Sequence, residues 1–154
     1  MYPCPVTLVT CVNEKGQDNI ITVSWIGVLC SDPPVIGIGI HKDHYSRGII
    51  EESGGGVVVN IPDDKLVEKA DYCGIVSGKD VDKFSKVGLT REPAKIVRAP
   101  FIREYPVNLE CVVRERLDLG SHKLYVGEVV GTNVDEGVMD AKGNIDFTKT
   151  APFV

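Results

Sequence analysis

Leucine and alanine are scarce in this chain of 154 residues, which contains only 8 Leu and 5 Ala. Valine and isoleucine take their place, with 23 and 13 residues. Branching at Cβ restricts the side-chain rotamers and suits a pleated strand better than a helix. The composition therefore excludes a helix bundle and favours a mainly β fold, in which the 16 Gly and 9 Pro provide turns between short strands.

Long apolar runs and concentrated positive charge are also missing. No apolar stretch reaches the roughly 20 residues that a membrane-spanning helix needs, and the first residues lack the charged-then-apolar layout of a signal peptide. The formal net charge of −5 is spread along the chain, whereas nucleic acids and anionic membranes are bound by concentrated basic surfaces. We therefore expect neither a nucleic-acid partner nor a membrane partner.

Compact metal-ligand and nucleotide-binding motifs are absent as well. The 5 Cys and 3 His form no C-x-x-C, H-E-x-x-H or similar cluster, so we expect no metal site. An odd number of Cys without a secretion signal indicates reduced thiols and a cytoplasmic location. Gly37 and Gly39 begin a dinucleotide motif, but Lys42 stands where its third glycine belongs. Residues 74–80 resemble a phosphate-binding loop that is one residue short and ends in Asp80, so the common nucleotide folds are excluded.

Apolar patterning predicts strands near both ends of the chain, with helices between them. The expected strands cover residues 6–12, 20–25, 35–40, 57–61, 107–116 and 124–134. The expected helices cover residues 45–53, a segment through residue 73 that Asp63 caps, and a short piece that begins at residue 80. This order indicates a single domain over residues 1–154, a closed or nearly closed β-barrel with peripheral α-helices rather than a doubly wound sheet.

Polar groups gather at two places in this pattern. Thr22 and Ser24 alternate along a strand, so both hydroxyls lie on one face. Residues 41–47 combine two imidazoles, two cations and a hydroxyl at the start of a predicted helix, where free N–H groups favour an anion. Gly37 and Gly39 leave one strand face bare, either for a neighbouring strand or for a ligand.

Taken in order, several segments resemble the flavin reductase-like, FMN-binding split-barrel family, and above all its flavoredoxin-type members. These segments are T-V-S-W, S-D-P-P, H-Y-S, V-V-V-N-I-P, Y-C-G-I-V-S-G-K-D-V-D-K-F and L-G-S-H-K-L-Y-V-G-E-V, and they extend over about residues 5–134. The resemblance implies a mainly β fold with a six-stranded Greek-key barrel. It also implies a homodimer that holds non-covalent FMN near its interface.

The resemblance also implies a role for each matching residue. Lining of the flavin ring and ribityl chain falls to Thr22, Val23, Ser24 and Trp25, with Cys30 and Ser31 beside the ring. Ser46 would bind the phosphate, helped by Lys42, His44 or Tyr45. Asn60 would reach the ribityl or phosphate region. Closure over the cofactor falls to Lys83 and Phe84. The catalytic candidates are His122, at the position used beside nicotinamide or substrate, and Cys30.

Structural alternatives stand beside these roles. Trp25 could fill the core, Cys30 could be an inert buried thiol, Asn60 could satisfy backbone groups at a strand end, and His122 could be a solvated loop residue. Ser121 stands where many reductases of the family have Asp before the histidine.

The expected function is an FMN-dependent oxidoreductase that passes electrons from NAD(P)H to free flavin, ferric iron or a redox protein. The alternatives are a flavoredoxin-like electron carrier without NAD(P)H activity, and a barrel that binds another ligand.

Overall fold

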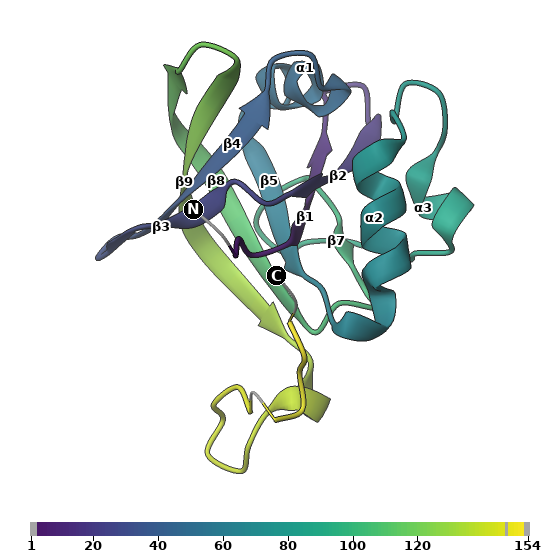
Figure 1. Ribbon diagram of the computed structural model, residues 1–154. Coiled ribbons are helices and arrows are strands. Elements are labelled where there is room, and N and C mark those ends of the chain that lie inside the picture. The colour runs from purple at the N-terminus through teal and green to yellow at the C-terminus, as the bar shows by residue number, and fades with distance from the viewer. Residues whose placement is uncertain (1–2, 147, 153–154) are drawn as a thin grey trace.

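The computed structural model describes residues 3–146 and 148–152. Its main element is an antiparallel sheet of seven strands, in the order β2-β1-β5-β8-β9-β4-β3 (Figure 1). The strands are β1 (Thr7–Val12), β2 (Asp18–Val23), β3 (Ile26–Ser31), β4 (Pro34–His41), β5 (Gly56–Ile61), β8 (Val107–Asp118) and β9 (His122–Val134). A separate short pair is formed by β6 (Arg91–Glu92) and β7 (Phe101–Ile102).

The main sheet curls until its two ends nearly meet. The backbone N–H of Gly39 on β4 donates to the carbonyl of Trp25, just after β2, at 2.7 Å. The mainly β fold with peripheral helices is thus confirmed, and each predicted strand is present. The sequence patterning missed β3, because this edge strand is mostly exposed and lacks a buried face.

Three short helices lie outside the barrel (Figure 1). They are α1 (Tyr45–Glu52), α2 (Val67–Ile75) and α3 (Lys83–Val87), with 3-10 turns at η1 (Asp64–Leu66) and η2 (Glu136–Val138). Asp63 accepts a bond from the Lys65 amide and so caps η1, not α2. The single helix expected after Asp63 is therefore two consecutive pieces.

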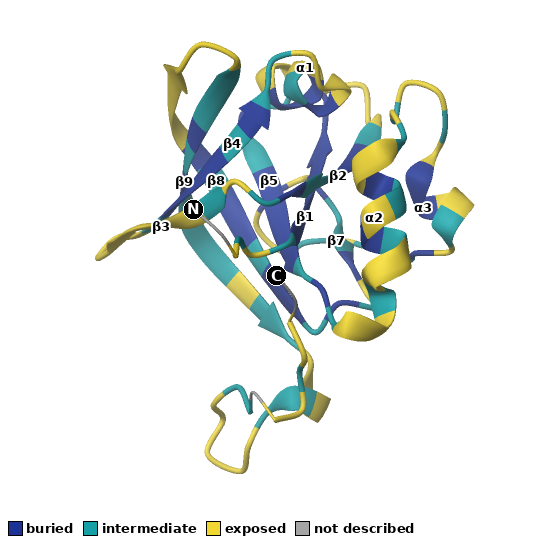
Figure 2. Cartoon of the chain, in the orientation of Figure 1, coloured by how far each residue is buried: buried dark blue, intermediate teal, exposed yellow. Residues whose placement is uncertain are grey.

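The residues of β1 and β2 are mostly buried (Figure 2). Apolar side chains pack against both faces of these strands. One cluster fills the barrel and includes Val9, Ile38 and Val59, whereas another lies beneath α2 and α3 and includes Leu8 and Phe84. Because both of its faces are covered, every residue of β1 is buried. The result is a rigid wall behind the starts of α1 and α3.

The bare face of Gly37 and Gly39 is covered by the protein itself. A Cβ at Gly37 would lie 3.1 Å from side-chain atoms of Leu29 and Leu124, and one at Gly39 would lie 3.2 Å from the Trp25 Cβ. Neighbouring side chains therefore cover Gly37, whereas Gly39 packs against Trp25 and also lines one of the cavities described below. In the described part of the chain, none of the helices is long and apolar enough to cross a membrane.

Candidate functional site

Two adjoining cavities lie where the ends of β2, β4 and β9 meet the helices. The first, here called the aromatic groove, has a volume of about 190 Å³ and is lined by residues of the segments 21–25, 39–41, 44 and 122. The second, here called the anion pocket, has a volume of about 150 Å³ and is lined by residues 19, 21, 43–46, 73–78 and 83. Ile21 and His44 line both, so the two cavities adjoin each other.

The aromatic groove gathers the only Trp and all three His of the chain. The rings of Trp25 and His122 stack with centroids 3.9 Å apart. His41 meets His122 edge-on at 4.9 Å, because β4 and β9 pair these two residues in register. Burial, together with the nearby His41, His122 and Lys83, lowers the pKa of His44 below its ordinary 6.5. His44 is therefore neutral at neutral pH and able to accept or donate one hydrogen bond.

The anion pocket is bordered by the start of α1 and by the end of α2 with its following loop, residues 74–78. His44 precedes α1 without a side-chain capping bond, so the first amides of this helix are open to an outside acceptor. Ser46 is buried, and its Oγ accepts a bond from Asn19 Nδ2 at 2.8 Å. Hydroxyl and amide donors therefore converge on one small space.

Lys83 supplies a positive charge to the same pocket. Its side chain is only 5% exposed, and Nζ donates to the carbonyls of Ile20 and Cys73, each at 2.7 Å. Burial lowers the pKa of Lys83. In the described part of the chain no carboxylate pairs with this ammonium group, and an ammonium has three protons to donate. A bound anion would compensate a buried charge that is otherwise costly.

The structure brings together most of the residues expected from the sequence. In the aromatic groove these are Thr22, Val23, Ser24, Trp25 and His122, and in the anion pocket His44, Tyr45, Ser46 and Lys83. Trp25 is 61% exposed, so it does not fill the core.

Three other expected residues lie outside both cavities. Lys42 forms an ion pair with Asp118 and lines neither space. Cys30 and Ser31 are exposed at the far end of β3, where the Cys30 thiol contacts the carbonyl of Asp32 at 3.4 Å. The structure of one chain therefore does not place Cys30 and Ser31 beside Trp25, and the alternative of a buried Cys30 is wrong as well.

Asn60 and Phe84 are interior residues. Asn60 is fully buried: Nδ2 donates to the Leu8 carbonyl and Oδ1 accepts from the Ile102 amide, both at 2.8 Å. Its amide is satisfied by the barrel, which corrects the expectation that it reaches a cofactor. Phe84 is 1% exposed and packs beneath α2, with the Arg91 guanidinium 4.2 Å from its ring centre. It supports Lys83 from behind and does not close over the cavity.

Sequence reasoning missed three parts of the site. Asn19 lies on β2, just before the strand expected at residues 20–25, and was not singled out. His41 was not separated from its polar neighbours, and the loop at residues 74–78 was set aside as an incomplete nucleotide motif. The glycines of that loop were the available signal, because they let backbone approach closely.

A larger hollow of about 650 Å³ lies elsewhere, against β6, β7 and the end of β9. Residues that line it include Phe101, Arg103, Asn108, Thr132 and Met139, and none of the expected site residues does. This hollow also contains aromatic rings and cationic side chains, but it contains none of the residues that the family resemblance singles out.

The two adjoining cavities suit a flat ring joined to an anionic group. Aromatic and aliphatic side chains form the groove, whereas hydroxyl, amide and ammonium donors form the pocket. Together the two spaces reach the lower end of the roughly 300–1,000 Å³ typical of small-molecule sites. The protein is thus a small β-barrel whose two cavities fit a planar ring and an anionic group.

Comparison with known proteins agrees with this class. Residues 1–149 match the flavin reductase like domain, and the chain belongs to this family. The structure of flavoredoxin from Desulfovibrio vulgaris (Miyazaki F) superposes with a TM-score of 0.92 at 34% identity, over 99% of this chain and 81% of that one. Flavoredoxin from Methanosarcina acetivorans gives a TM-score of 0.88 at 35% identity, over 99% and 79%. An uncharacterised protein of Archaeoglobus fulgidus is 31% identical over 96% of this chain and 81% of its own length.

Proposed function

We propose that this protein is an FMN-binding oxidoreductase that transfers a hydride or electrons through non-covalently bound FMN. The observation that carries the proposal is that the aromatic groove adjoins a pocket that contains the buried Lys83 ammonium, with Ile21 and His44 shared between the two. A ring system with a dianionic tail matches both halves at once. Membership of the flavin reductase family and likeness to two flavoredoxins support the same cofactor.

In this proposal the chain binds and orients the cofactor. Ser46 and Lys83 donate hydrogen bonds to the phosphate, helped by the first amides of α1. Trp25, Ile21 and Val23 contact the flavin ring and exclude water from it. When bound, FMN supplies hydride and electron transfer.

We assign His122 to the substrate side of the groove. Its ring is held between Trp25 and His41, and Ser121 Oγ lies 2.9 Å from Nδ1. The position suits a group that binds a nicotinamide or holds a proton for the electron acceptor. A serine next to this ring supplies no negative charge, unlike the aspartate of many family members, so Nδ1 of His122 has a hydroxyl partner in place of a carboxylate.

NAD(P)H is our first candidate for the electron donor, and a redox protein is the second. The flavoredoxin-like carrier is favoured by the same Ser121, because a carboxylate that would hold a charged histidine is lacking there.

We also propose a homodimer in the cytoplasm. β3 is an edge strand of the sheet, and its Val28 and Leu29 are 79% and 54% exposed. An unpaired edge with apolar side chains favours association with a second copy. Cys30 and Ser31 lie on this strand, so a partner would bring them to a cofactor near the interface. The molar mass in solution, measured by light scattering after size-exclusion chromatography, tests the dimer. The Val28→Asp variant is expected to have the mass of a monomer.

One set of visible spectra tests the function. The protein is incubated with FMN, the unbound FMN is removed, and separate samples are titrated anaerobically with NADH and with NADPH. A yellow protein bleached by either nucleotide is the expected result. A yellow protein that neither nucleotide reduces, but that a reduced ferredoxin does, establishes the carrier instead. Colourless protein that ignores added FMN overturns the proposal in favour of another ligand.

A further inference from the structure

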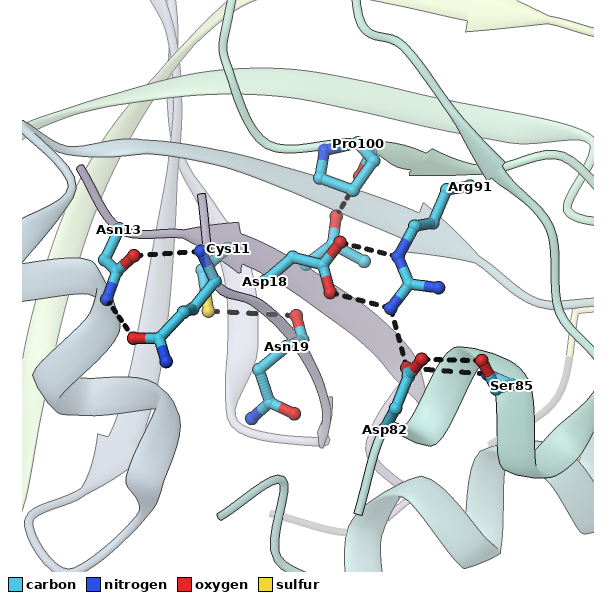
Figure 3. A network of polar contacts seen from close by, with 10 residues as sticks. Cys11, Asn13, Asp18, Asn19, Asp82, Ser85, Arg91 and Pro100 are labelled. Atoms are coloured by element: carbon cyan, nitrogen blue, oxygen red, sulfur yellow. Dashed lines mark hydrogen bonds and ion pairs between the residues drawn. The ribbon is translucent and has the colours of Figure 1, made fainter. Parts of the chain in front are cut away.

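Asn19 is a buried residue at the back of the anion pocket. It is 4% exposed and lies on β2, between Asp18 and Ile20. The backbone at this point is held from two sides. Arg91 bonds the Asp18 carboxylate through Nε at 2.6 Å and also reaches Asp82, while the Cys11 thiol contacts the Asn19 carbonyl at 3.8 Å (Figure 3). The Asn19 amide points away from Cys11 (Figure 3), toward the pocket that it lines.

The amide of Asn19 determines how the Ser46 hydroxyl is used. Asn19 Nδ2 donates to Ser46 Oγ at 2.8 Å. An amide NH₂ can only donate, so the Ser46 oxygen is the acceptor in this pair and its proton is directed elsewhere. The Cys11 thiol is hydrogen-bonded to the Ser46 side chain, so an anion in the pocket would compete with it for the hydrogen bond from the Ser46 O–H.

The other side of the Asn19 amide touches the loop across the pocket. A Cβ at Gly78 would lie only 1.9 Å from Asn19 Oδ1 and 2.4 Å from Cγ, so only glycine lets the loop pass this close. Asn19 thus contacts both borders of the pocket, the start of α1 through Ser46 and the loop through Gly78. Neither contact involves the aromatic groove.

We propose that Asn19 is a positioning residue for the phosphate of the cofactor: it orients the Ser46 hydroxyl as a donor and sets the distance between α1 and the Gly78 loop. This inference rests on the proposed FMN site and extends it to a residue that would act through Ser46. It requires that Asn19 affect the phosphate selectively, because Asn19 lines the anion pocket and not the aromatic groove.

The experiment compares FMN with riboflavin, which has the same ring and no phosphate. Affinities are measured by quenching of flavin fluorescence for the full chain and for Asn19→Leu, with a similar volume and no donor. Asn19→Leu is expected to weaken FMN binding about tenfold, the effect of one charge-assisted hydrogen bond, and to change riboflavin binding by less than about twofold. The second variant is Asn19→Ser, whose side chain is too short to reach Ser46. It is expected to show the same selective loss of FMN affinity, and it replaces Asn19→Leu in the test where that variant does not fold.

A double-mutant cycle separates positioning from general loosening of the pocket. In a Ser46→Ala background, Asn19→Leu is expected to cause a smaller further loss than in the wild type, since one of the two groups through which it acts is gone. Gly78→Ala should reproduce the selective loss of FMN affinity, whereas Gly48→Ala, where a Cβ meets no atom within 4 Å, should not.

The outcomes distinguish the two levels of the proposal. If the wild-type protein binds riboflavin as tightly as FMN, the anion pocket is not a phosphate site, and the proposed function fails with it. If the wild-type protein prefers FMN but Asn19→Leu and Asn19→Ser keep that preference, only the role of Asn19 is overturned. Full additivity of Asn19→Leu and Ser46→Ala overturns it as well.

Discussion

The indole of Trp25 and the imidazole of His122 are stacked, with ring centroids 3.9 Å apart and an angle of 27° between the planes. Trp25 follows β2 and His122 begins β9, so the stack joins two ends of the barrel wall. The indole nevertheless remains 61% exposed. A large apolar ring held against one partner and open on its other side is suited to receive a second planar ring.

Trp25 should therefore report flavin binding through its own fluorescence. It is the only Trp in the chain, so excitation of indole observes this groove alone. We expect saturating FMN to quench most of the tryptophan emission, and riboflavin to do the same at higher concentration. Trp25→Phe supplies the tyrosine background. Emission that stays constant while the protein turns yellow would place the ring outside the aromatic groove.

Substitution of two lysines, Lys83 and Lys42, is expected to have different effects on binding of the FMN phosphate. Lys83 is buried in the anion pocket, whereas Lys42 is paired with Asp118 at the surface. We expect Lys83→Met to weaken FMN binding roughly 10- to 100-fold with little effect on riboflavin, because a buried charge-assisted bond is lost. Lys42→Met should leave FMN affinity within about twofold, as exposed ion pairs contribute little. Equilibrium titration with both flavins checks the pair, and the reverse ranking would restore Lys42 as the phosphate ligand.

Strand positions could be predicted from the sequence because their apolar patterns are local. Residues 57–61 are apolar except for Asn60. They lie in β5 and have buried side chains on both faces of the strand. β3 had no such signal, because Val28, Leu29 and Cys30 face outward. An exposed edge strand has no buried face, so its sequence has no apolar periodicity from which the strand could be predicted.

For the site, the sequence indicated residue types but not their directions. Ser46 and Trp25 reach the cavities as expected, while Asn60, of equally suitable chemistry, points into the barrel wall and bonds Leu8 and Ile102. The choice between these directions depends on the register of β1 with β5, which is a long-range property. Asn19 was missed for the same reason, since its partner Ser46 is distant in the chain.

Glu110 should make stability depend on acid pH. Its buried carboxylate on β8 accepts bonds from the amides of Lys95, Ile96 and Val97 and from Asn133 Nδ2, and so fixes the segment before β7. Burial raises the pKa of Glu110, but these hydrogen bonds lower it further than burial raises it, and the net pKa lies below the ordinary 4.5. A carboxyl group with a depressed pKa stabilises the fold above its unfolded pKa, and this contribution is lost as the pH falls through the folded value.

We therefore expect the free energy of unfolding to decrease below about pH 4.5, with part of that decrease absent in Glu110→Gln. At pH 7 the variant should be less stable by about 2–3 kcal/mol, because an amide cannot accept all four donors. Urea unfolding at several pH values measures both effects. Glu128→Gln serves as the control, since its partner Arg114 is exposed. Equal pH profiles for the wild type and Glu110→Gln would contradict the assignment.

Two buried tyrosines make the last prediction, which concerns the cost of an unpaired hydroxyl. Tyr105 and Tyr125 are each 1% exposed. Tyr125 Oη donates to Glu51 at 3.0 Å, whereas Tyr105 Oη has no hydrogen-bond partner among the described residues. Burial of an unpaired hydroxyl costs about 1–3 kcal/mol, and loss of a paired one costs about 1 kcal/mol. Tyr105→Phe should therefore raise the midpoint of thermal unfolding by roughly 2–12 °C, and Tyr125→Phe should lower it by roughly 2–4 °C. Calorimetry of the two variants beside the wild type decides the matter, because a lower midpoint for Tyr105→Phe would mean that bound water satisfies this hydroxyl.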